Sequence, residues 1–148
     1  MKVSTKGRYG LRAMVDLVIY SKGECLALSA IAERQNISTN YLEQVFSALR
    51  KAGLVKSIKG AQGGYYLDKD PADISVGDVL RVLEGKLSIA ESTEEQNMEQ
   101  NTIKYCLKTM VWDKIEERIN EVVDAITLED LANEYKRING METLMYYI

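Results

Sequence analysis

The sequence predicts a mainly α-helical fold that carries one small β-hairpin and a long helix near its C-terminal end. Short amphipathic helices in the N-terminal half lead into a basic hairpin over residues 55–67 that turns on glycines. One apolar stripe extends over about six helical turns from residue 103. The length of 148 residues suits one compact unit, or a small domain with an appended helical arm.

The first helix is predicted to begin at Ser4 or Thr5, either of which can cap it, and to end near Tyr20. Its apolar positions form a broad stripe: Tyr9, Leu11, Met14, Leu17, Val18 and Ile19. Residues 21–25 then turn the chain. A short second helix is predicted over Leu28–Gln35.

A third helix follows from the N-cap Ser38 to a stop near Gly53, after a turn of the helix-turn-helix kind at Asn36 and Ile37. Its apolar residues recur at three and four and predict one buried face: Leu42, Val45, Phe46 and Leu49. The opposite face is polar in the first turns. In a helix that lies in the major groove, such N-terminal side chains reach base edges.

The segment after the third helix predicts a hairpin whose loop contains Lys59, Gly60, Gln62, Gly63 and Gly64. A loop this thin can approach a phosphate backbone or enter a minor groove. Helix and hairpin together predict a winged helix-turn-helix DNA-binding domain. The alternative is a surface helix beside an ordinary hairpin.

Beyond the hairpin, Pro71 marks its exit and Ser75 opens a further helix that Gly85 closes. Residues 86–101 are acidic and polar, which predicts a flexible loop. Thr127 caps a last helix that extends through Arg137.

The long helix predicts a dimerisation element, because one narrow apolar stripe over that length suits packing along the same helix of a second subunit. The residues of the stripe are Ile103, Leu107, Met110, Val111, Ile115, Ile119, Val122 and Ile126. The alternative is a helix folded back onto its own domain. A dimer would place two recognition helices about one turn of duplex apart, on a palindromic operator.

Charge is divided unevenly along the chain. The net charge is −3, yet residues 1–67 carry +6 and residues 68–148 carry −9. Basic residues cluster in the first twelve positions and around the hairpin, where Arg50, Lys56 and Lys59 lie. This distribution suits phosphate contacts and predicts salt-dependent binding to double-stranded DNA, although a solvated basic face would look alike.

Other features exclude several classes of protein. The absence of histidine removes classical catalytic triads and zinc sites, so we expect no enzyme. Two cysteines cannot form a disulfide framework and suit a reducing compartment. The longest apolar stretch, residues 13–20, is interrupted by Asp16 and is too short for a membrane span, so we expect a cytoplasmic protein without a signal peptide.

Three segments carry a family resemblance: KVSTKGRYGLRAM, NYLEQVFSALRKAGLVKSIKGAQGGYYL and SVGDVLRVLEG. They resemble the signatures of the Rrf2 family of winged-helix transcriptional regulators, and the likeness covers nearly the whole chain. The resemblance implies a dimeric repressor or activator. It divides the chain into a DNA-binding domain (1–85), an acidic loop (86–102) and a dimerisation helix with a C-terminal helix and tail (103–148).

Family roles carry over to matching residues. Base-reading positions would be Asn40, Tyr41, Glu43 and Gln44, where Glu43 can accept from a cytosine amino group and Gln44 can pair with adenine. Lys59 and Gly60 would form the wing tip, where the family often has an arginine, so shape recognition would be weaker here. Lys6, Arg8, Ser38, Arg50 and Lys56 complete the expected DNA contacts.

Many family members sense iron–sulfur status, nitric oxide or iron through three cysteines before the long helix. This chain has only Cys106 between Gly85 and Trp112, and one thiolate cannot hold a cluster within a subunit. We therefore expect no metal and no cofactor; a site shared across a dimer stays open as an alternative.

Within the family, STKGRYGL, YLEQ, AGLVKS, TLEDLA and the final YYI resemble most closely a repressor of cysteine metabolism from Gram-positive bacteria. That likeness implies complex formation with cysteine synthase, the O-acetylserine thiol-lyase. A docking tail is hypothesised at Met145, Tyr146, Tyr147 and Ile148, whose isoleucine would enter the active site of the synthase. The alternative is a tail packed on the dimer core.

Cys25 offers a different input. It lies in the turn before the second helix, near the N-terminal basic region, where a thiol could have a lowered pKa and oxidise to a sulfenic acid. A buried, inert cysteine is the alternative.

A dimeric interaction adaptor that binds no DNA is an alternative function for the whole chain, since it would share the long helix and the tail.

Overall fold

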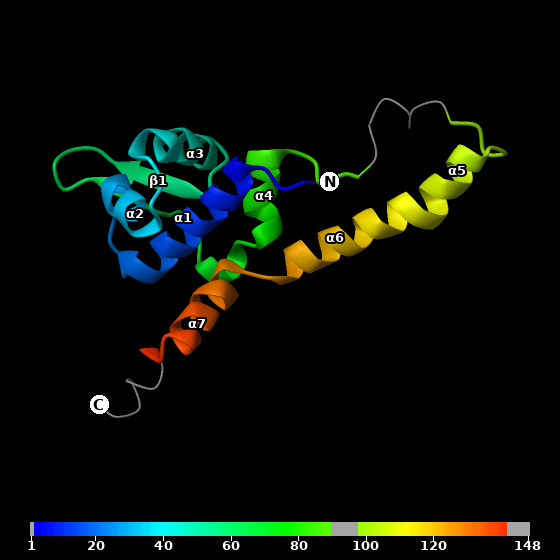
Figure 1. The fold of residues 1–148 in the computed structure, drawn as a ribbon. Coiled ribbons are helices and arrows are strands. Elements are labelled where there is room, and N and C mark those ends of the chain that lie inside the picture. The colour runs from blue at the N-terminus through cyan, green and yellow to red at the C-terminus, as the bar shows by residue number, and fades with distance from the viewer. Residues whose placement is uncertain (1, 90–97, 142–148) are drawn as a thin grey trace.

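The structure is a computed structural model that describes residues 2–89 and 98–141 (Figure 1). It confirms a mainly helical chain with one two-stranded antiparallel hairpin, the winged-helix arrangement. The elements in order are α1 (Thr5–Ser21), α2 (Leu28–Gln35), α3 (Thr39–Lys51), β1 (Val55–Ile58), β2 (Gly64–Leu67), a 3-10 turn η1 (Pro71–Asp73), α4 (Val76–Glu84), α5 (Ile103–Leu107), a π-helical turn η2 (Lys108–Trp112), α6 (Asp113–Ala125) and α7 (Leu128–Ile138).

The core lies where α1, α2, α3 and α4 converge above the hairpin. Phe46 at its centre is fully buried, and its ring meets Tyr65 of β2 edge-on with the ring centroids 5.0 Å apart. Met14 and Leu17 from α1 and Ile31 from α2 are also fully buried. Burial of such side chains contributes roughly 1.5–3 kcal/mol each, so the predicted apolar stripes account for the assembly of the helices.

Four helices begin at the polar caps that the sequence predicts. The Ser4 hydroxyl accepts from the Gly7 amide, and the Ser38 hydroxyl accepts from the Tyr41 amide at 3.1 Å. Ser75 and Thr127 each form a reciprocal capping box with the aspartate three residues later. A side-chain cap stabilises a helix by about 1 kcal/mol, which explains why these starts can be located from sequence.

The wing is anchored to the segment between α1 and α2. β1 and β2 pair from Val55 with Leu67 to Ile58 with Gly64. On the other edge of β2, Leu26 and Tyr65 exchange two backbone hydrogen bonds of 2.8 and 2.9 Å. A Cβ atom at Gly64 would collide with the Leu26 backbone, so glycine is required for this approach.

The long helix leaves the body as an arm formed by α5, η2 and α6 (Figure 1). The sequence predicts a regular α-helix here, but a π turn interrupts it at Lys108–Trp112. The extra residue of a π turn rotates the residues before it relative to those after it, and such turns are frequent at functional sites. The spacing of apolar residues in the sequence does not reveal the single extra residue that a π turn inserts into a helix.

Ile126 departs from its predicted place on the dimer stripe. The helix ends at Ala125, and Ile126 is extended, with its carbonyl accepting from the Val76 amide at 2.8 Å. Its side chain packs on the small cluster of Val76, Leu80 and Leu87. Ile126 therefore contributes to contacts within its own chain.

The last helix, α7, packs against α1 in the same body as the winged helix. The Leu128 amide donates to the Ile74 carbonyl at 2.9 Å, and the hydroxyls of Tyr20 and Tyr135 lie 3.2 Å apart. Among residues 2–89 and 98–141, none of the helices is long and apolar enough to cross a membrane.

Candidate nucleic-acid interface

The outer face of α3 presents three of the four predicted base-reading side chains to solvent. Asn40, Glu43 and Gln44 are exposed, while Leu42 and Val45 on the inner face are buried. This division follows from the helical period, which places residues 40, 43 and 44 on one side. The arrangement leaves amide and carboxylate groups available for base edges.

Tyr41 is placed differently from its neighbours. Its ring is half-buried against the core and lies edge-on to Tyr9 of α1, with the centroids 5.9 Å apart. The ring therefore fixes α3 against α1. A role in base reading remains a prediction for its hydroxyl.

Further predicted contacts flank α3. Ser38 is exposed, but its hydroxyl already accepts from the Tyr41 amide as the helix cap. Arg50 is exposed near the C-terminal end of α3 and makes no ion pair within the described residues. Its guanidinium is available for a phosphate.

The start of α1 supplies two exposed cations, Lys6 and Arg8. The Arg8 Nε donates to the Val3 carbonyl at 3.1 Å, which leaves its terminal nitrogens for other partners. Arg12, one turn later, donates to the Gln35 carbonyl at 2.6 Å and lies over the Tyr9 ring at 5.2 Å. Arg12 thereby joins the N-terminal helix to the end of α2.

The wing tip carries Lys59, which is exposed, and Gly60, whose φ of 111° favours glycine. Lys56 on β1 pairs with Asp68 at 3.0 Å, and the hydrogen bond that its ammonium donates to this carboxylate raises the pKa of Lys56. A phosphate would compete with Asp68 for this ammonium. Counting charges along the sequence does not reveal the pairing.

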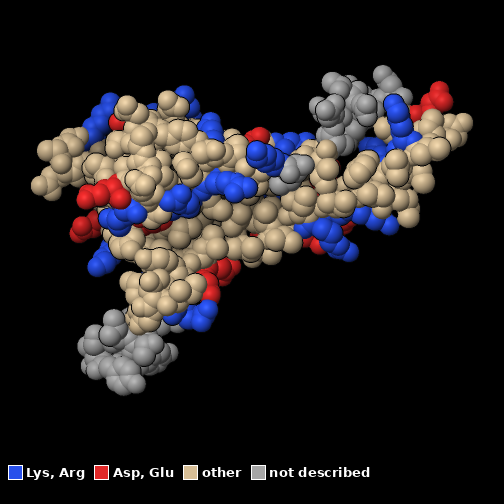
Figure 2. Space-filling model, in the orientation of Figure 1, with Lys and Arg blue, Asp and Glu red and all other residues tan. Residues whose placement is uncertain are grey.

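Figure 2 shows basic side chains in a row across the middle of the body, where α1 lies, and in separate groups at the upper edge near α3. This face is therefore rich in positive charge although the chain as a whole is acidic.

An ion pair with a buried carboxylate joins α2 to α1. The Asp16 carboxylate is fully buried and accepts two hydrogen bonds from Arg34, at 2.9 and 2.7 Å, and one from Gln35 at 2.9 Å. The Arg34 guanidinium stacks over Tyr20 at 4.2 Å, and its hydrogen bond with Asp16 raises the pKa of Arg34. The sequence signal for this ion pair is Asp16, the one acid within the apolar stretch of residues 13–20.

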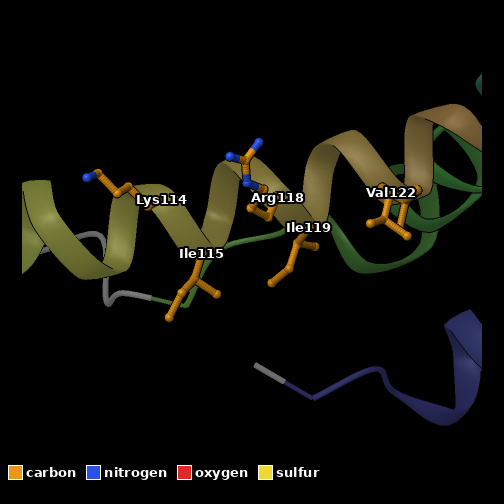
Figure 3. A pocket seen from close by; sticks show the side chains of 6 residues that line it. Lys114, Ile115, Arg118, Ile119 and Val122 are labelled. Atoms are coloured by element: carbon orange, nitrogen blue, oxygen red, sulfur yellow. The ribbon is translucent and has the colours of Figure 1, made fainter.

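The arm exposes large apolar side chains on α5, η2 and α6. Figure 3 shows Ile115, Ile119 and Val122 pointing to one side of α6, where they line a hollow of about 460 Å³. Lys114 and Arg118 border it. Further large apolar side chains are exposed on this arm: Ile103, Leu107 and Met110, whereas Val111 is half-buried. Exposed apolar surface of this extent is typical of an interaction site.

Cys25 is half-buried, and its Sγ donates to the Gln62 carbonyl at 3.2 Å, beside the wing tip. Cys106 is exposed on α5. The proposed docking residues Met145, Tyr146, Tyr147 and Ile148 lie outside the described residues.

Three comparisons with known proteins agree on a family. A sequence profile of the Rrf2 family, described as iron-dependent transcriptional regulators, matches residues 3–134. The regulator CymR of Bacillus subtilis strain 168 is 44% identical over 148 residues, which is all of this chain and all of that protein.

Solved structures agree with the sequence relatives. The structure of B. subtilis CymR (YrzC), described as the global cysteine regulator, superposes with a TM-score of 0.77 at 46% identity and covers 90% of this chain and 98% of its own. An oxidised form of Staphylococcus aureus CymR superposes with a TM-score of 0.69 at 39% identity, with 89% and 96% covered.

The iron dependence in the family description does not fit the donors described here. Within residues 2–89 and 98–141, no group of three or more histidine, cysteine or acidic residues is placed to hold a metal. Cys25 lies in the body and Cys106 on the arm, so the described thiols do not form a shared site within one chain.

Proposed function

This chain belongs to the Rrf2 family of transcriptional regulators, and from that premise we propose that it is a dimeric repressor of cysteine and sulfur metabolism genes that acts in the cytoplasm. The observation that carries the proposal is the exposed polar face of α3, with Asn40, Glu43 and Gln44 beside the basic wing tip at Lys59. We propose no enzymatic activity for this chain.

In the proposed complex α3 lies in the major groove of double-stranded DNA. Gln44 pairs with adenine and Glu43 accepts from a cytosine amino group. Lys59 and Gly60 approach the minor groove or its phosphates, while Lys6, Arg8 and Arg50 bind the phosphate backbone. We assign these contacts to residues 1–85, the proposed DNA-binding domain.

The proposed dimer forms through the exposed face of the arm. A second copy would cover Ile115, Ile119 and Val122, and the exposed apolar residues of α5 and η2 would extend the contact. An Ile119→Glu variant is expected to sediment as a monomer, because a carboxylate would be buried without a partner. Glu117→Gln, on the opposite face of α6, should remain dimeric; a dimeric Ile119→Glu protein would contradict the assignment.

The proposed input is a partner enzyme. The CymR relative is described as a global cysteine regulator. The residues proposed to dock on cysteine synthase are Met145, Tyr146, Tyr147 and Ile148. In this proposal the apolar tail enters the active site of the synthase, and O-acetylserine competes with it.

The test is a fluorescence anisotropy titration of labelled promoter DNA from the protein's own sulfur-metabolism genes, at two salt concentrations. We expect salt-dependent binding that cysteine synthase tightens and O-acetylserine reverses. A variant lacking residues 145–148 should bind DNA equally but ignore the synthase. If DNA binds tightly alone and the enzyme changes nothing, the partner input is wrong while the DNA-binding function stands.

The absence of salt-dependent binding to any duplex would contradict the DNA-binding function. It would favour the interaction adaptor, which needs the arm but not the polar face of α3.

Cys25 supports a second candidate input, redox sensing. Its thiol touches the wing loop through the Gln62 carbonyl, and the S. aureus relative has an oxidised form. Peroxide would oxidise the thiolate to a sulfenic acid and leave hydroxide, and the added oxygen would displace the wing. Cys25→Ser should abolish any peroxide sensitivity of DNA binding, whereas Cys106→Ser should retain it. Equal sensitivity of Cys25→Ser and the parent would remove this candidate.

A further inference from the structure

A cleft of about 410 Å³ lies on the body between side chains of α1 and α7. α1 contributes Val15 and Ile19 to its wall, and α7 contributes Leu131 and Ile138. Ile138 is 68% exposed, so the cleft is open to solvent. The volume lies in the range of small-molecule sites, which combine apolar walls with a few convergent polar groups.

The polar groups of the cleft leave an excess of positive charge. Its two acids are matched: Asp16 by Arg34, and Glu134 by Arg137 through hydrogen bonds of 2.9 and 2.5 Å. The two arginines that line it, Arg8 and Arg12, have no carboxylate within ion-pair distance among the described residues and donate only to backbone carbonyls.

Along α1 the two cations of the cleft come before the apolar residues Val15 and Ile19. Arg8 and Arg12 are one helical turn apart on α1, and Val15 and Ile19 continue the same face. At 1.5 Å per residue, Ile19 lies roughly 10 Å beyond Arg12 along the helix axis. An occupant must therefore offer an anionic head at one end and an apolar body at the other.

We infer that this cleft binds a small organic carboxylate with an apolar body, which Arg12 and Arg8 hold by its head group. The guanidinium fork suits a carboxylate, because two parallel N–H donors can meet its two oxygens. Val15, Ile19, Leu131 and Ile138 receive the body.

Binding there would act on the helix-turn-helix directly. Arg12 donates to the carbonyl of Gln35, the last residue of α2, and Asn36 follows with a left-handed φ of 54° as the turn begins. A carboxylate that engages the other nitrogens of Arg12 draws the guanidinium toward the cleft and weakens its hydrogen bond to this carbonyl. The end of α2 then loses one of its ties to α1, and the affinity for DNA falls.

The effect on DNA rests on the proposed function, whereas binding of the carboxylate does not, so the two are measured separately. Isothermal titration of the full-length protein without DNA uses octanoate as the probe and octanol as its neutral counterpart. We expect one octanoate site per chain and at least about tenfold weaker binding of octanol, since a charge-assisted hydrogen bond is lost.

Variants then assign the site. Arg12→Gln should weaken octanoate binding about tenfold, Arg12→Lys less, and Ile138→Gln should weaken it through the exposed apolar wall without endangering the fold. Lys136→Gln, which removes a charge from α7 outside the cleft, should bind like the parent. Circular dichroism melts verify that each variant is folded.

Absence of octanoate binding, or binding that Arg12→Gln leaves unchanged, would overturn the site. Octanoate should also weaken promoter binding in the anisotropy assay for the parent but not for Arg12→Gln. Normal octanoate binding with unchanged DNA affinity would overturn the coupling. If the protein binds no DNA, the proposed function fails, and the titration without DNA still decides the site.

Discussion

The thiol of Cys25 donates a hydrogen bond to the main-chain oxygen of Gln62 at 3.2 Å, and thereby joins the turn before α2 to the loop of the wing. The next residue, Leu26, pairs with Tyr65 of β2, so the contact continues the edge of the wing sheet. The position of the wing tip therefore depends on a segment 37 residues earlier in the chain.

This contact predicts different effects for its two residues. Cys25→Ala should lower the free energy of unfolding by about 0.5–1 kcal/mol and weaken DNA binding, because the wing loses a tie. Gln62→Ala should change neither, since the acceptor is the backbone carbonyl. Urea denaturation and DNA anisotropy measure both. Equal losses in the two variants would show that the side chain of Gln62 matters instead.

The buried Asp16 carboxylate is predicted to stabilise the helix-turn-helix strongly. Asp16→Asn should lower the free energy of unfolding by about 2 kcal/mol, because the buried amide would turn an N–H group toward the donors of Arg34 and Gln35 and leave it without an acceptor. Urea denaturation provides the measurement.

The exposed pair of Arg118 and Glu121 supplies the control for Asp16. Glu121→Gln should change the free energy of unfolding far less than Asp16→Asn does, since solvent screens the pair. A similar small loss for Asp16→Asn would mean that the buried pair is replaceable by a neutral hydrogen bond.

The pair of Arg81 and Asp124 between α4 and α6 predicts a pH dependence. The hydrogen bond that Arg81 donates lowers the pKa of Asp124 below its usual value of 3.8. The folded state therefore favours the deprotonated carboxylate more strongly than the unfolded state does. Its contribution is therefore complete above pH 3.8 and is lost as the pH falls through the lower folded-state value.

The stability difference between the parent and Asp124→Asn should accordingly be constant from about pH 7 to 5 and shrink below about pH 4, as denaturant titrations at each pH would show. Arg81→Gln should remove the same pH dependence, because it removes the partner. A difference that stays constant down to acid pH would contradict the role of this pair.

DNA binding is predicted to separate specificity from affinity on two elements. Gln44→Ala should cost about 1–3 kcal/mol on the operator and little on unrelated DNA, as expected for a base contact. Lys59→Gln should weaken both sequences and reduce the salt slope by about 1, as expected for a phosphate contact. Anisotropy titrations over a salt series distinguish them, and the reverse pattern would exchange the two roles.

The elements that the sequence predicted well are those set by local rules. The caps at Ser38 and Ser75 and the hairpin over 55–67 depend on neighbours within a few residues, so local patterning was sufficient. The π turn at Lys108–Trp112 and the departure of Ile126 from the stripe were not predicted, because each depends on packing and on hydrogen bonds made at a distance.

The candidate site divides in the same way. The polar face at Asn40, Glu43 and Gln44 follows from the helical period alone. The pairing of Lys56 with Asp68 and the packing of Tyr41 on Tyr9 required the fold, since a charge or a ring in a sequence does not reveal its partner.

By itself, the sequence determined the winged-helix architecture, the family and the uneven charge, because hydrophobic period, caps and turn residues are written locally. Only the tertiary structure decided which polar groups are already engaged and which remain available. It brought Asp16 to Arg34, Cys25 to Gln62 and Arg12 to Gln35, and it opened a cleft between the first and last helices. These contacts join residues that lie far apart in the sequence, so sequence spacing alone does not reveal them.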